Sequence, residues 1–452
     1  MPLSEFPLPA ADAAGDEPPE IHVAPPGPMS RSAAKRLAAV ECPAFGQRRD
    51  ARAEQSGLDM VPIVLASGKG SNLYDVDNNR YVDLIAGFGA LLLGHGATPV
   101  LRSVEGQAAR LLMGLGDVYS ADAKIALLER VAALHPGVRP RVMLTQSGSD
   151  AVTAALKTAR LATGKPGIVA FEGGYHGLGY GPLPACGARP SYAAPFADQL
   201  NAHVSFAPYA RTEADLDRAL GAVERALARG DAGAVLIEPV LGRGGCVVPP
   251  DALLTGVIEL AHRHGALVIA DEIWTGLGRS GSMVRSTSVG APADILCFGK
   301  GLGGGVSISA CVASEDVMMA WADPSRGEVL HTSTHAGSPM ACAAAVATLD
   351  ALRFRKLPAR AAELGERARG MFQRALEGRP GVVEVRGAGL MIGIELDGGE
   401  RALRAMRGML GRGYLVLTGG TRGETLTLTP ALNIAEDRLA EAALALGEVL
   451  GP

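Results

Sequence analysis

Several features that mark common classes of protein are scarce or missing in this sequence. Lysine and arginine number 43 against 47 aspartates and glutamates, the formal net charge is −4, and no basic run occurs. A nucleic-acid partner is therefore not expected, because proteins that bind nucleic acid usually carry a clustered basic surface. No apolar stretch approaches the roughly 18 residues of a membrane helix, so no membrane partner is expected either.

The sequence also lacks the marks of export and of structural metal binding. Its N-terminus has no basic region followed by an apolar core, so it does not resemble a secretory signal. The cysteines show no C-x-x-C spacing, which favours buried reduced thiols over a disulfide framework or a zinc site. They are Cys42, Cys186, Cys246, Cys297, Cys311 and Cys342. We therefore expect a cytoplasmic protein without a metal site.

The length and composition predict a large folded protein with a disordered N-terminal tail. The chain has 452 residues, of which 48% are hydrophobic and 20% charged, which is enough for two or three domains with a large core. Residues 1–30 are rich in proline, alanine and acidic side chains, a composition that favours disorder. After this tail we expect a segment over 31–85 that packs with the small domain, a large domain over 86–335 and a small C-terminal domain over 336–452.

Apolar runs that alternate with helical patterns between residues 140 and 310 predict an α/β fold. Short apolar runs separated by amphipathic helices are typical of a mostly parallel sheet that is covered on both faces. The predicted strands are RVMLTQ, GIVAFEG, AGAVLIEPV, GALVIADEI and ADILCFGK. After residue 340, two long helices (341–354 and 358–377) and several strands predict a smaller α+β domain.

Polar residues stand where these predicted strands end, and they are Ser147, Glu238, Asp271 and Lys300. Ligands of open parallel sheets bind at the carboxyl ends of the strands. We therefore expect a functional site at this edge of the sheet.

The stretch CFGKGLGGG, residues 297–305, allows two interpretations. Gly299, Gly301 and Gly304 fit the G-x-G-x-x-G pattern of a dinucleotide-binding turn. Such a turn should open a helix, but these glycines lead into a strand-like segment, which disfavours a nicotinamide-dependent dehydrogenase. In the second interpretation the loop presents Lys300, one of seven lysines, as an amine whose pKa is lowered by burial. A lysine at the loop edge with a solvated head is the alternative.

Two further elements indicate what such a lysine would serve. Asp271 ends a neighbouring predicted strand, and QSGSDAV at 146–152 offers a helix N-terminus whose N–H groups can bind a phosphate. A lysine for a Schiff base and an aspartate for a pyridinium nitrogen are what pyridoxal phosphate requires. An aspartate in this position is often only a helix cap, but the three elements together predict this cofactor.

These motifs resemble those of the class III aminotransferases, enzymes of pyridoxal-phosphate fold type I, over about residues 60–440. The similar stretches are QSGSDAVTAALKTARLATGK, FEGGYHG, IEPVLGRGG, IADEIWTGLGRSG, DILCFGKGLGGG and HTSTHAGSPMACAAAVA. The resemblance implies a large cofactor-binding α/β domain with a mostly parallel sheet, and a smaller α+β C-terminal domain. It also implies pyridoxal 5'-phosphate as the cofactor and a homodimer with shared active sites.

The resemblance also implies roles for single residues. Lys300 is the expected Schiff-base residue, Asp271 binds the ring nitrogen, and Ile273 covers a face of the ring on which Tyr175 stacks. Thr334 reaches the cofactor phosphate of the partner subunit. The full set of expected cofactor-binding residues is Gly148, Ser149, Tyr175, His176, Glu238, Asp271, Ile273, Lys300 and Thr334.

One departure from the family pattern bears on the substrate. Many members carry an arginine that clamps a substrate α-carboxylate a few residues before a Pro-Pro-Leu stretch. Here that position holds Thr427, and Ala431 replaces the second proline. A threonine cannot form the two-pronged ion pair of an arginine, which leaves Arg422, Arg243 or Arg279 as substitutes. We therefore expect a donor such as a β- or ω-amine or a larger intermediate.

The predicted reaction moves an amino group from an amine or amino acid to an oxo acceptor. Lys300 and Asp271 are the expected catalytic residues, with the lysine amine as general base and then acid, and with ping-pong kinetics. An amino-acid racemase or epimerase on the same scaffold is the alternative, because it differs only in returning the proton to the substrate carbon. The expected partners are small amines, oxo acids and a second copy of the chain.

Overall fold

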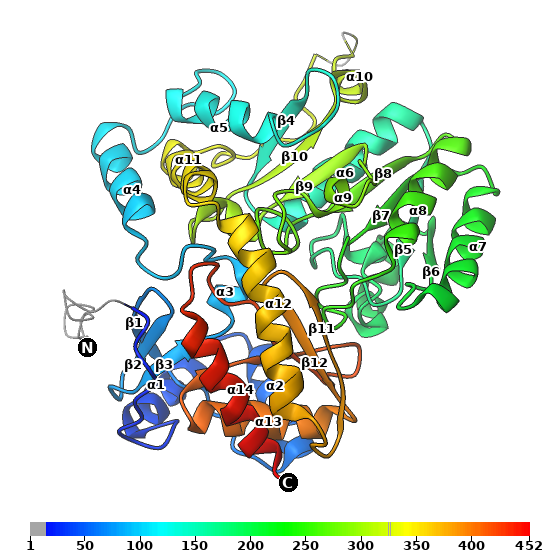
Figure 1. Cartoon of the computed structure of the whole chain (residues 1–452). Helices are drawn as coiled ribbons and strands as arrows, with labels where there is room; N and C mark the ends of the chain where they lie inside the picture. Colours follow the sequence, from blue (N-terminus) through cyan, green and yellow to red (C-terminus); the bar gives the residue numbers. More distant parts are fainter. Residues whose placement is uncertain (1–14, 324, 326) are drawn as a thin grey trace. The chain divides into compact units, whose positions relative to one another are not determined.

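The computed structural model describes residues 15–323, 325 and 327–452, which form two compact units (Figure 1). Unit 1 combines the described residues up to Ala97 with Glu363–Pro452, and unit 2 is the continuous segment Thr98–Ala362. The chain therefore begins in unit 1, forms the whole of unit 2 and then returns to unit 1.

Unit 2 is built around a seven-stranded sheet with the order β4-β10-β9-β8-β7-β5-β6. Its strands are β4 (Arg141–Thr145), β5 (Gly167–Phe171), β6 (Val204–Ala207), β7 (Ala232–Ile237), β8 (Leu267–Asp271), β9 (Ile295–Phe298) and β10 (Ser309–Ala313). Strand β10 is antiparallel to both β4 and β9, and the other neighbouring strands are parallel. The predicted α/β fold with a mostly parallel sheet is confirmed.

Helices cover both faces of this sheet, which explains why its strands are apolar throughout. Helix α6 (Gly148–Thr163) packs across β4 and β7–β10, whereas α7 (Leu216–Leu227) contacts β5 and β6 and α8 (Asp251–Arg263) contacts β7 and β8 (Figure 1). In β7, Ala234 and Leu236 join the core beside α6, and the alternating Val235 and Ile237 are also buried. Burial on both faces favours continuous apolar runs over alternation.

Further elements of unit 2 precede, follow or connect these strands. The helices are α4 (Thr98–Arg110), α5 (Asp122–Ala132), α9 (Arg285–Ser288), α10 (Glu315–Met318) and α11 (Pro339–Phe354). The short 3-10 helices are η2 (Leu183–Ala185), η3 (Pro190–Tyr192), η4 (Ala194–Gln199), η5 (Glu213–Asp215), η6 (Lys300–Gly303) and η7 (Met319–Trp321). Helix α11 packs on α4 and α5.

Unit 1 contains two four-stranded sheets, of which the first combines strands from both ends of the chain. The first has the order β1-β2-β3-β13, with β1 (Leu65–Lys69), β2 (Asn72–Asp75), β3 (Arg80–Asp83) and β13 (Tyr414–Leu415). The second has the order β11-β12-β15-β14, with β11 (Val382–Ala388), β12 (Met391–Leu396), β15 (Thr425–Leu428) and β14 (Leu417–Gly419). The helices are α1 (Pro28–Ala38), α2 (Pro43–Ser56), α3 (Ala86–Gly89), α12 (Leu357–Leu376, which begins in unit 2), α13 (Gly399–Gly411) and α14 (Glu436–Leu450).

The structure differs from the expected N-terminal tail over residues 15–30. Residues 1–14 lie outside the described residues. The backbone of Glu20 pairs with that of Arg80, and the N–H groups of Met29 and Ser30 donate to the carboxylate of Asp77 at 2.7 and 2.9 Å. Composition favoured disorder, but these hydrogen bonds come from partners about 50 residues away in sequence, which composition does not reveal.

The structure also divides the chain at positions other than the expected 85/86 and 335/336. Residues 86–97 belong to unit 1, where Gly70 and His95 form a backbone bridge. Residues 336–362 belong to unit 2, because the alanine-rich face of α11 is buried against α4 and α5. Both assignments depend on contacts between distant segments rather than on local pattern.

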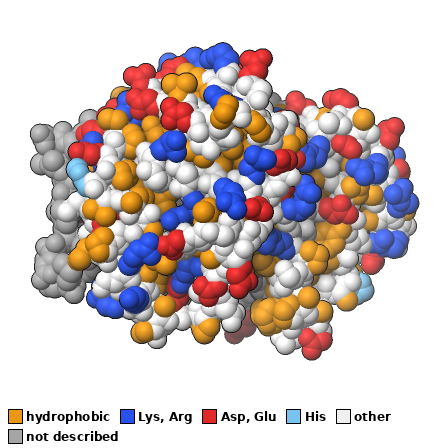
Figure 2. All heavy atoms as spheres, turned by 90° about the horizontal axis from the view of Figure 1, so that it is seen from below, with side chains coloured by type: hydrophobic (Ala, Val, Ile, Leu, Met, Phe, Trp, Pro, Cys, Tyr) orange, Lys and Arg blue, Asp and Glu red, His pale blue; other side chains and the backbone are white. Residues whose placement is uncertain are grey.

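Among the described residues, no helix has both the length and the apolar character that a membrane crossing requires. On the face shown in Figure 2, basic and acidic side chains are interspersed, with apolar side chains between them. That face carries no continuous area of one charge sign.

Candidate active site

The carboxyl ends of several strands bring the predicted polar residues to one edge of the sheet in unit 2. Ser147 follows β4, Glu238 follows β7, Asp271 ends β8, and Lys300 follows β9. The parallel register pairs Asp271 with Cys297, three residues before Lys300. Because β4, β5, β7, β8 and β9 run in the same direction, their ends form a single rim.

Lys300 lies at the first position of η6 with a left-handed φ of 38°. A lysine rarely adopts this conformation, and such strain concentrates at functional sites. Burial is the largest influence on its amine and lowers the pKa of Lys300, although the negative charges of Asp271 and Glu238 act to raise it. Gly299 makes room for the turn, since a Cβ there would lie 2.8 Å from the Ser309 hydroxyl.

Asp271 forms a buried pair with His176, which follows β5. The Asp271 Oδ2 atom lies 2.8 Å from Nδ1 of His176, and its Oδ1 accepts the N–H of Ile273 at 3.1 Å. Burial alone would lower the pKa of His176, but the hydrogen bond and charge of Asp271, together with the charge of Glu238, raise it above its usual value. Nε2 of His176 is buried without a hydrogen-bond partner in the described part of the chain.

Glu238 forms hydrogen bonds to both of the loops that follow β5 and β7. Its carboxylate accepts the backbone N–H of Tyr175 at 2.8 Å and that of Gly242 at 3.0 Å. Burial, assisted by the negative charge of Asp271, raises the pKa of Glu238 to about 7. The side chain of Tyr175 meets Tyr192 edge-on, with ring centroids 6.3 Å apart.

The N-terminus of α6 lies at the same rim, where the sequence predicts a phosphate-binding site. The Ser147 hydroxyl caps the helix by accepting the N–H of Asp150 at 3.2 Å, and the Ser149 hydroxyl accepts the N–H of Gly179 at 3.0 Å. The first N–H groups of a helix have no partner within it and attract anions. Gly148 lies close to the turn after β8, because a Cβ there would lie 2.9 Å from Cδ1 of Ile273.

Thr334 does not join this cluster within one chain. It is exposed, and it lines a small cavity together with Met113 and Tyr119.

The arginines considered for a substrate carboxylate have different surroundings. Arg243 is close enough to Lys300 for its charge to lower the pKa of that amine, whereas Arg279 is fully buried. Arg422 and Thr427 belong to unit 1.

The structure adds a residue that the sequence analysis did not select. Trp274 stands three residues after Asp271, and Nζ of Lys300 lies 4.6 Å from the centroid of its ring. Its indole Nε1 is buried without a hydrogen-bond partner among the described residues. The available signal was the rarity of tryptophan, which occurs twice in the chain.

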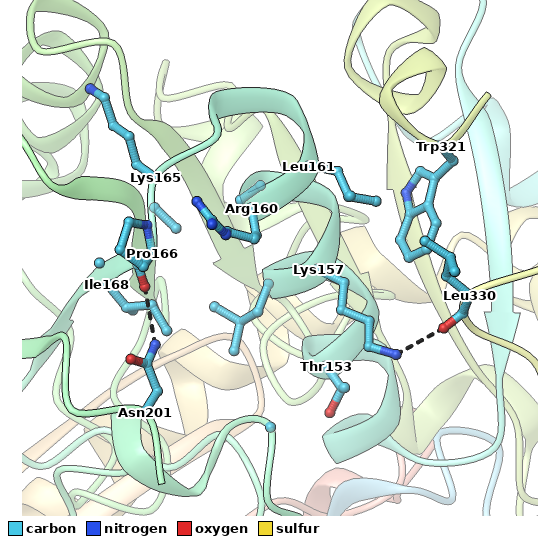
Figure 3. Close-up of a pocket in the computed structure, with 16 residues that line it drawn as sticks. Thr153, Lys157, Arg160, Leu161, Lys165, Pro166, Ile168, Asn201, Trp321 and Leu330 are labelled. Carbon is cyan, nitrogen blue, oxygen red and sulfur yellow. Dashed lines mark hydrogen bonds between the residues drawn. The ribbon is translucent and has the colours of Figure 1, made fainter. Parts of the chain in front are cut away.

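A larger cavity lies elsewhere in unit 2 and contains none of the predicted site residues. It measures about 490 Å³ and lies beside α6 and β5, with Lys157, Arg160 and Lys165 around apolar walls (Figure 3). Figure 3 shows the Lys157 amine directed to the carbonyl oxygen of Leu330, a distance of 3.0 Å. We assign the chemistry to the strand-end rim because the buried titratable groups lie there.

The residues of the rim fit pyridoxal phosphate. The cofactor needs an amine, an acid beside its ring nitrogen and an anion site, and Lys300, Asp271 and the start of α6 are of these types. The unpartnered Nε2 of His176 and Nε1 of Trp274 are buried polar atoms left for a bound group.

Comparison with known proteins decides the family. The sequence profile described as Aminotransferase class-III matches residues 53–450. The chain belongs to the class III aminotransferases. These are pyridoxal-phosphate-dependent enzymes, so the expected family, enzyme class, fold type and cofactor are confirmed.

Individual class III aminotransferases are similar over most of their length. An acetylornithine aminotransferase of Methanothermobacter thermautotrophicus is 36% identical, covering 86% of this chain and 94% of that protein. A putrescine aminotransferase of Pectobacterium atrosepticum is 35% identical, covering 83% and 79%. The crystal structure of a pyridoxal-phosphate-bound amine transaminase from an uncultivated Pseudomonas species superposes with a TM-score of 0.79 at 30% identity, covering 86% and 94%.

Proposed function

We propose that this class III aminotransferase takes the amino group from a donor with a primary amine at a chain end or at a β position, and passes it to an oxo acid. The observation that carries the proposal is the Lys300 amine, enclosed at a strand end and within electrostatic reach of Asp271. A cytoplasmic location remains a prediction.

Lys300 and Asp271 have complementary roles in this proposal. When bound, pyridoxal phosphate supplies a carbonyl that condenses with amines and a ring that accepts electrons from the substrate carbon. Asp271 holds a proton at the ring nitrogen, and its hydrogen bonds with His176 and Ile273 fix the direction of its carboxylate. The Lys300 amine would hold the cofactor, and the same Nζ atom would carry a proton once the donor has taken its place.

The surrounding residues orient the cofactor. We assign Gly148 and Ser149 to its phosphate, Tyr175 and Ile273 to the faces of its ring, and Glu238 to the alignment of the Tyr175 loop. The lowered pKa of Lys300, caused chiefly by burial, supports its role, because a free amine is needed to accept a proton.

We also propose that the active unit is a homodimer in which Thr334 completes the phosphate site of the partner subunit. Thr334 is exposed in its own chain and lies beside the segment 111–119. That segment exposes Leu111, Leu112, Leu115, Val118 and Tyr119 to between 43% and 69%. An exposed apolar patch of this kind is typical of an interface.

The donor class rests on a missing arginine and on the names of relatives. Thr427 replaces the arginine that clamps an α-carboxylate in many family members. The similar enzymes named above act on putrescine, which has two terminal amines and no carboxylate, and on acetylornithine, whose free amine is at the end of its side chain. Arg243 is the candidate partner for a carboxylate on the oxo acid, because its charge acts on Lys300.

A donor comparison tests the proposal. We expect kcat/KM for putrescine, N-acetylornithine or 4-aminobutyrate to exceed that for glutamate and alanine, with pyruvate and 2-oxoglutarate as acceptors. A bidentate arginine–carboxylate pair contributes roughly 2 to 5 kcal/mol when one partner is truncated. A preference for glutamate of about a hundredfold, or 2.7 kcal/mol, would therefore contradict the proposed donor class.

The requirement for an oxo acid separates transamination from the racemase alternative. An aminotransferase stops after one half-reaction when no acceptor is present, and its initial rates follow ping-pong kinetics. Sustained inversion of an amino acid without any oxo acid would instead support the racemase.

A further inference from the structure

Trp274 contacts the amine on which the proposed function depends. Nζ of Lys300 lies 4.6 Å from the centroid of the indole ring. An ammonium over the face of a tryptophan is attracted by the negative face of the ring, and the attraction grows where water is excluded. The turn after β8 thus presents a carboxylate, from Asp271, and an aromatic face, from Trp274, to the same amine.

The turn that carries Trp274 is fixed by buried hydrogen bonds. The carboxylate of Glu272 accepts the N–H and O–H groups of Ser286 at 2.7 and 2.9 Å and also binds the Thr275 hydroxyl. The N–H of Gly276 donates to the Glu272 carbonyl oxygen at 2.9 Å. Residues on both sides of Trp274 are therefore held, and the ring is placed by the backbone as well as by its own packing.

Charged groups also act on the Lys300 amine. Asp271 and Glu238 attract an ammonium, Arg243 repels it, and His176 is hydrogen-bonded to Asp271. Helix α11 and strand β10 also contact η6, where they place the neutral hydroxyls of Thr348 and Ser309 close to Gly304 and Gly299. Trp274 differs from the charged groups because it attracts the ammonium without a net charge.

We propose that Trp274 is a positioning residue for Lys300, whose ring holds the free amine in place and stabilises it after it has accepted a proton. The inference rests on the proposed function, because it takes Lys300 as the reacting amine, and extends it to a residue that acts through the lysine. The indole N–H, buried without a partner in the described part of the chain, is in addition a donor available to a bound group.

Cofactor capture by the full-length chain tests this role without measuring turnover. The protein is stripped of cofactor and mixed with pyridoxal 5'-phosphate over a series of pH values, and the absorbance of covalently bound cofactor is followed. Trp274→Leu removes the ring and with it the attraction for the ammonium, so the acid limb of the rate profile should move to lower pH by about one unit. Trp274→Phe keeps an aromatic face and should lie between wild type and Trp274→Leu. Coincident profiles for wild type and Trp274→Leu would overturn the inference.

A fluorescence measurement covers the case in which Trp274→Leu does not fold. The chain has two tryptophans, so Trp321→Phe leaves Trp274 as the single emitter. Its emission should change with pH as the nearby amine titrates, and the change should vanish when Lys300→Met is added. An unchanged titration with Lys300→Met would also overturn the inference.

The same variants separate this inference from the proposed function. If Lys300→Ala still binds the cofactor covalently, the lysine assignment fails. If Lys300→Ala abolishes covalent binding while Trp274→Leu behaves as wild type, only the role of Trp274 fails.

Discussion

Lys300 combines a backbone angle that lysine rarely adopts with an amine that is removed from water. A fold maintains such strain only where the surrounding structure fixes it. Here Gly299 admits the turn and Trp274 lies over the amine. The strained backbone and the buried amine of Lys300 both lower the stability of the fold, as is common for residues that take part in a reaction.

Replacing Lys300 with alanine should abolish turnover while the protein still folds. The rate should fall by at least about 10³-fold, because both the covalent attachment and the proton carrier are lost. Borohydride reduction followed by peptide mapping should label Lys300 in the wild type. Lys157→Ala, which alters a lysine of the separate cavity, serves as the control and should retain full activity. Labelling of a lysine other than Lys300 would contradict the assignment.

Replacing Asp271 with asparagine should weaken catalysis and should also lower the pKa of His176. The neutral amide no longer holds a proton at the cofactor ring, which should cost about 3 kcal/mol of transition-state stabilisation. His176 loses the partner that raises its pKa, so its titration in NMR spectra should move to lower pH. A rate close to that of the wild type would remove Asp271 from the mechanism.

Glu238 predicts a specific dependence of stability on pH. Its carboxyl titrates at about 7 in the folded protein and near 4.5 in an unfolded chain, so the folded state binds more protons between these values. The free energy of unfolding of the wild type, measured against Glu238→Gln, should therefore fall as pH rises from about 4.5 to about 7. Parallel pH dependence in the two proteins would show that Glu238 ionises normally.

At the scale of elements, the two ends of α6 are expected to serve different properties. Its start is expected to affect cofactor binding, and its end is expected to affect the stability of the fold. Gly148 at its start lies against Ile273, and Gly164 caps its end with a left-handed φ of 72° and no atom near its missing Cβ. A substitution at each end therefore tests a different property of one helix.

Alanine at these two positions should affect different properties. Gly148→Ala pushes on Ile273 and should weaken pyridoxal phosphate binding, measured by equilibrium titration, with little loss of stability. Gly164→Ala forces a left-handed alanine and should lower the free energy of unfolding by about 1 kcal/mol without changing cofactor affinity. Equal losses of affinity in both variants would mean that helix stability, and not the start of α6, controls binding.

The position of the polar residues at the strand ends could be predicted from the sequence because it depends on local patterns. Apolar runs locate the strands of a parallel sheet, and the residue that ends each run then falls on the rim, as with Asp271 and Lys300. The pair between His176 and Asp271 spans 95 residues and depends on the order β5-β7-β8 in the sheet, which local patterns do not give. Trp274 was visible as a rare residue, but the direction of its ring depends on a turn bound to Ser286.

At the scale of the whole molecule, the apolar segment 111–119 is the strongest structural argument for a dimer. Leu115 and Val118 are 63% and 69% exposed, and the same segment borders Thr334. Burial of this apolar surface between two subunits would stabilise a dimer.

Charged residues in this segment should therefore separate the subunits. Leu115→Asp with Val118→Asp should give a monomer by light scattering, with weakened cofactor binding and an unchanged circular dichroism spectrum. Val138→Asp, at a position that is 74% exposed elsewhere in unit 2, is the matched control and should remain dimeric. A fully active monomer of the double variant would contradict shared sites.

The division of the chain into units also sets the order in which the ribosome can complete them. A nascent chain that has reached Ala362 contains all of unit 2, whereas β3 still lacks its neighbour β13. At about 5 to 20 residues per second, the time between synthesis of β3 and β13 is roughly 15 to 65 s. During that interval an exposed strand edge invites pairing with other chains. Expression of this enzyme should therefore respond to chaperones and to temperature through its smaller unit, even though the predicted catalytic residues reside in the larger one.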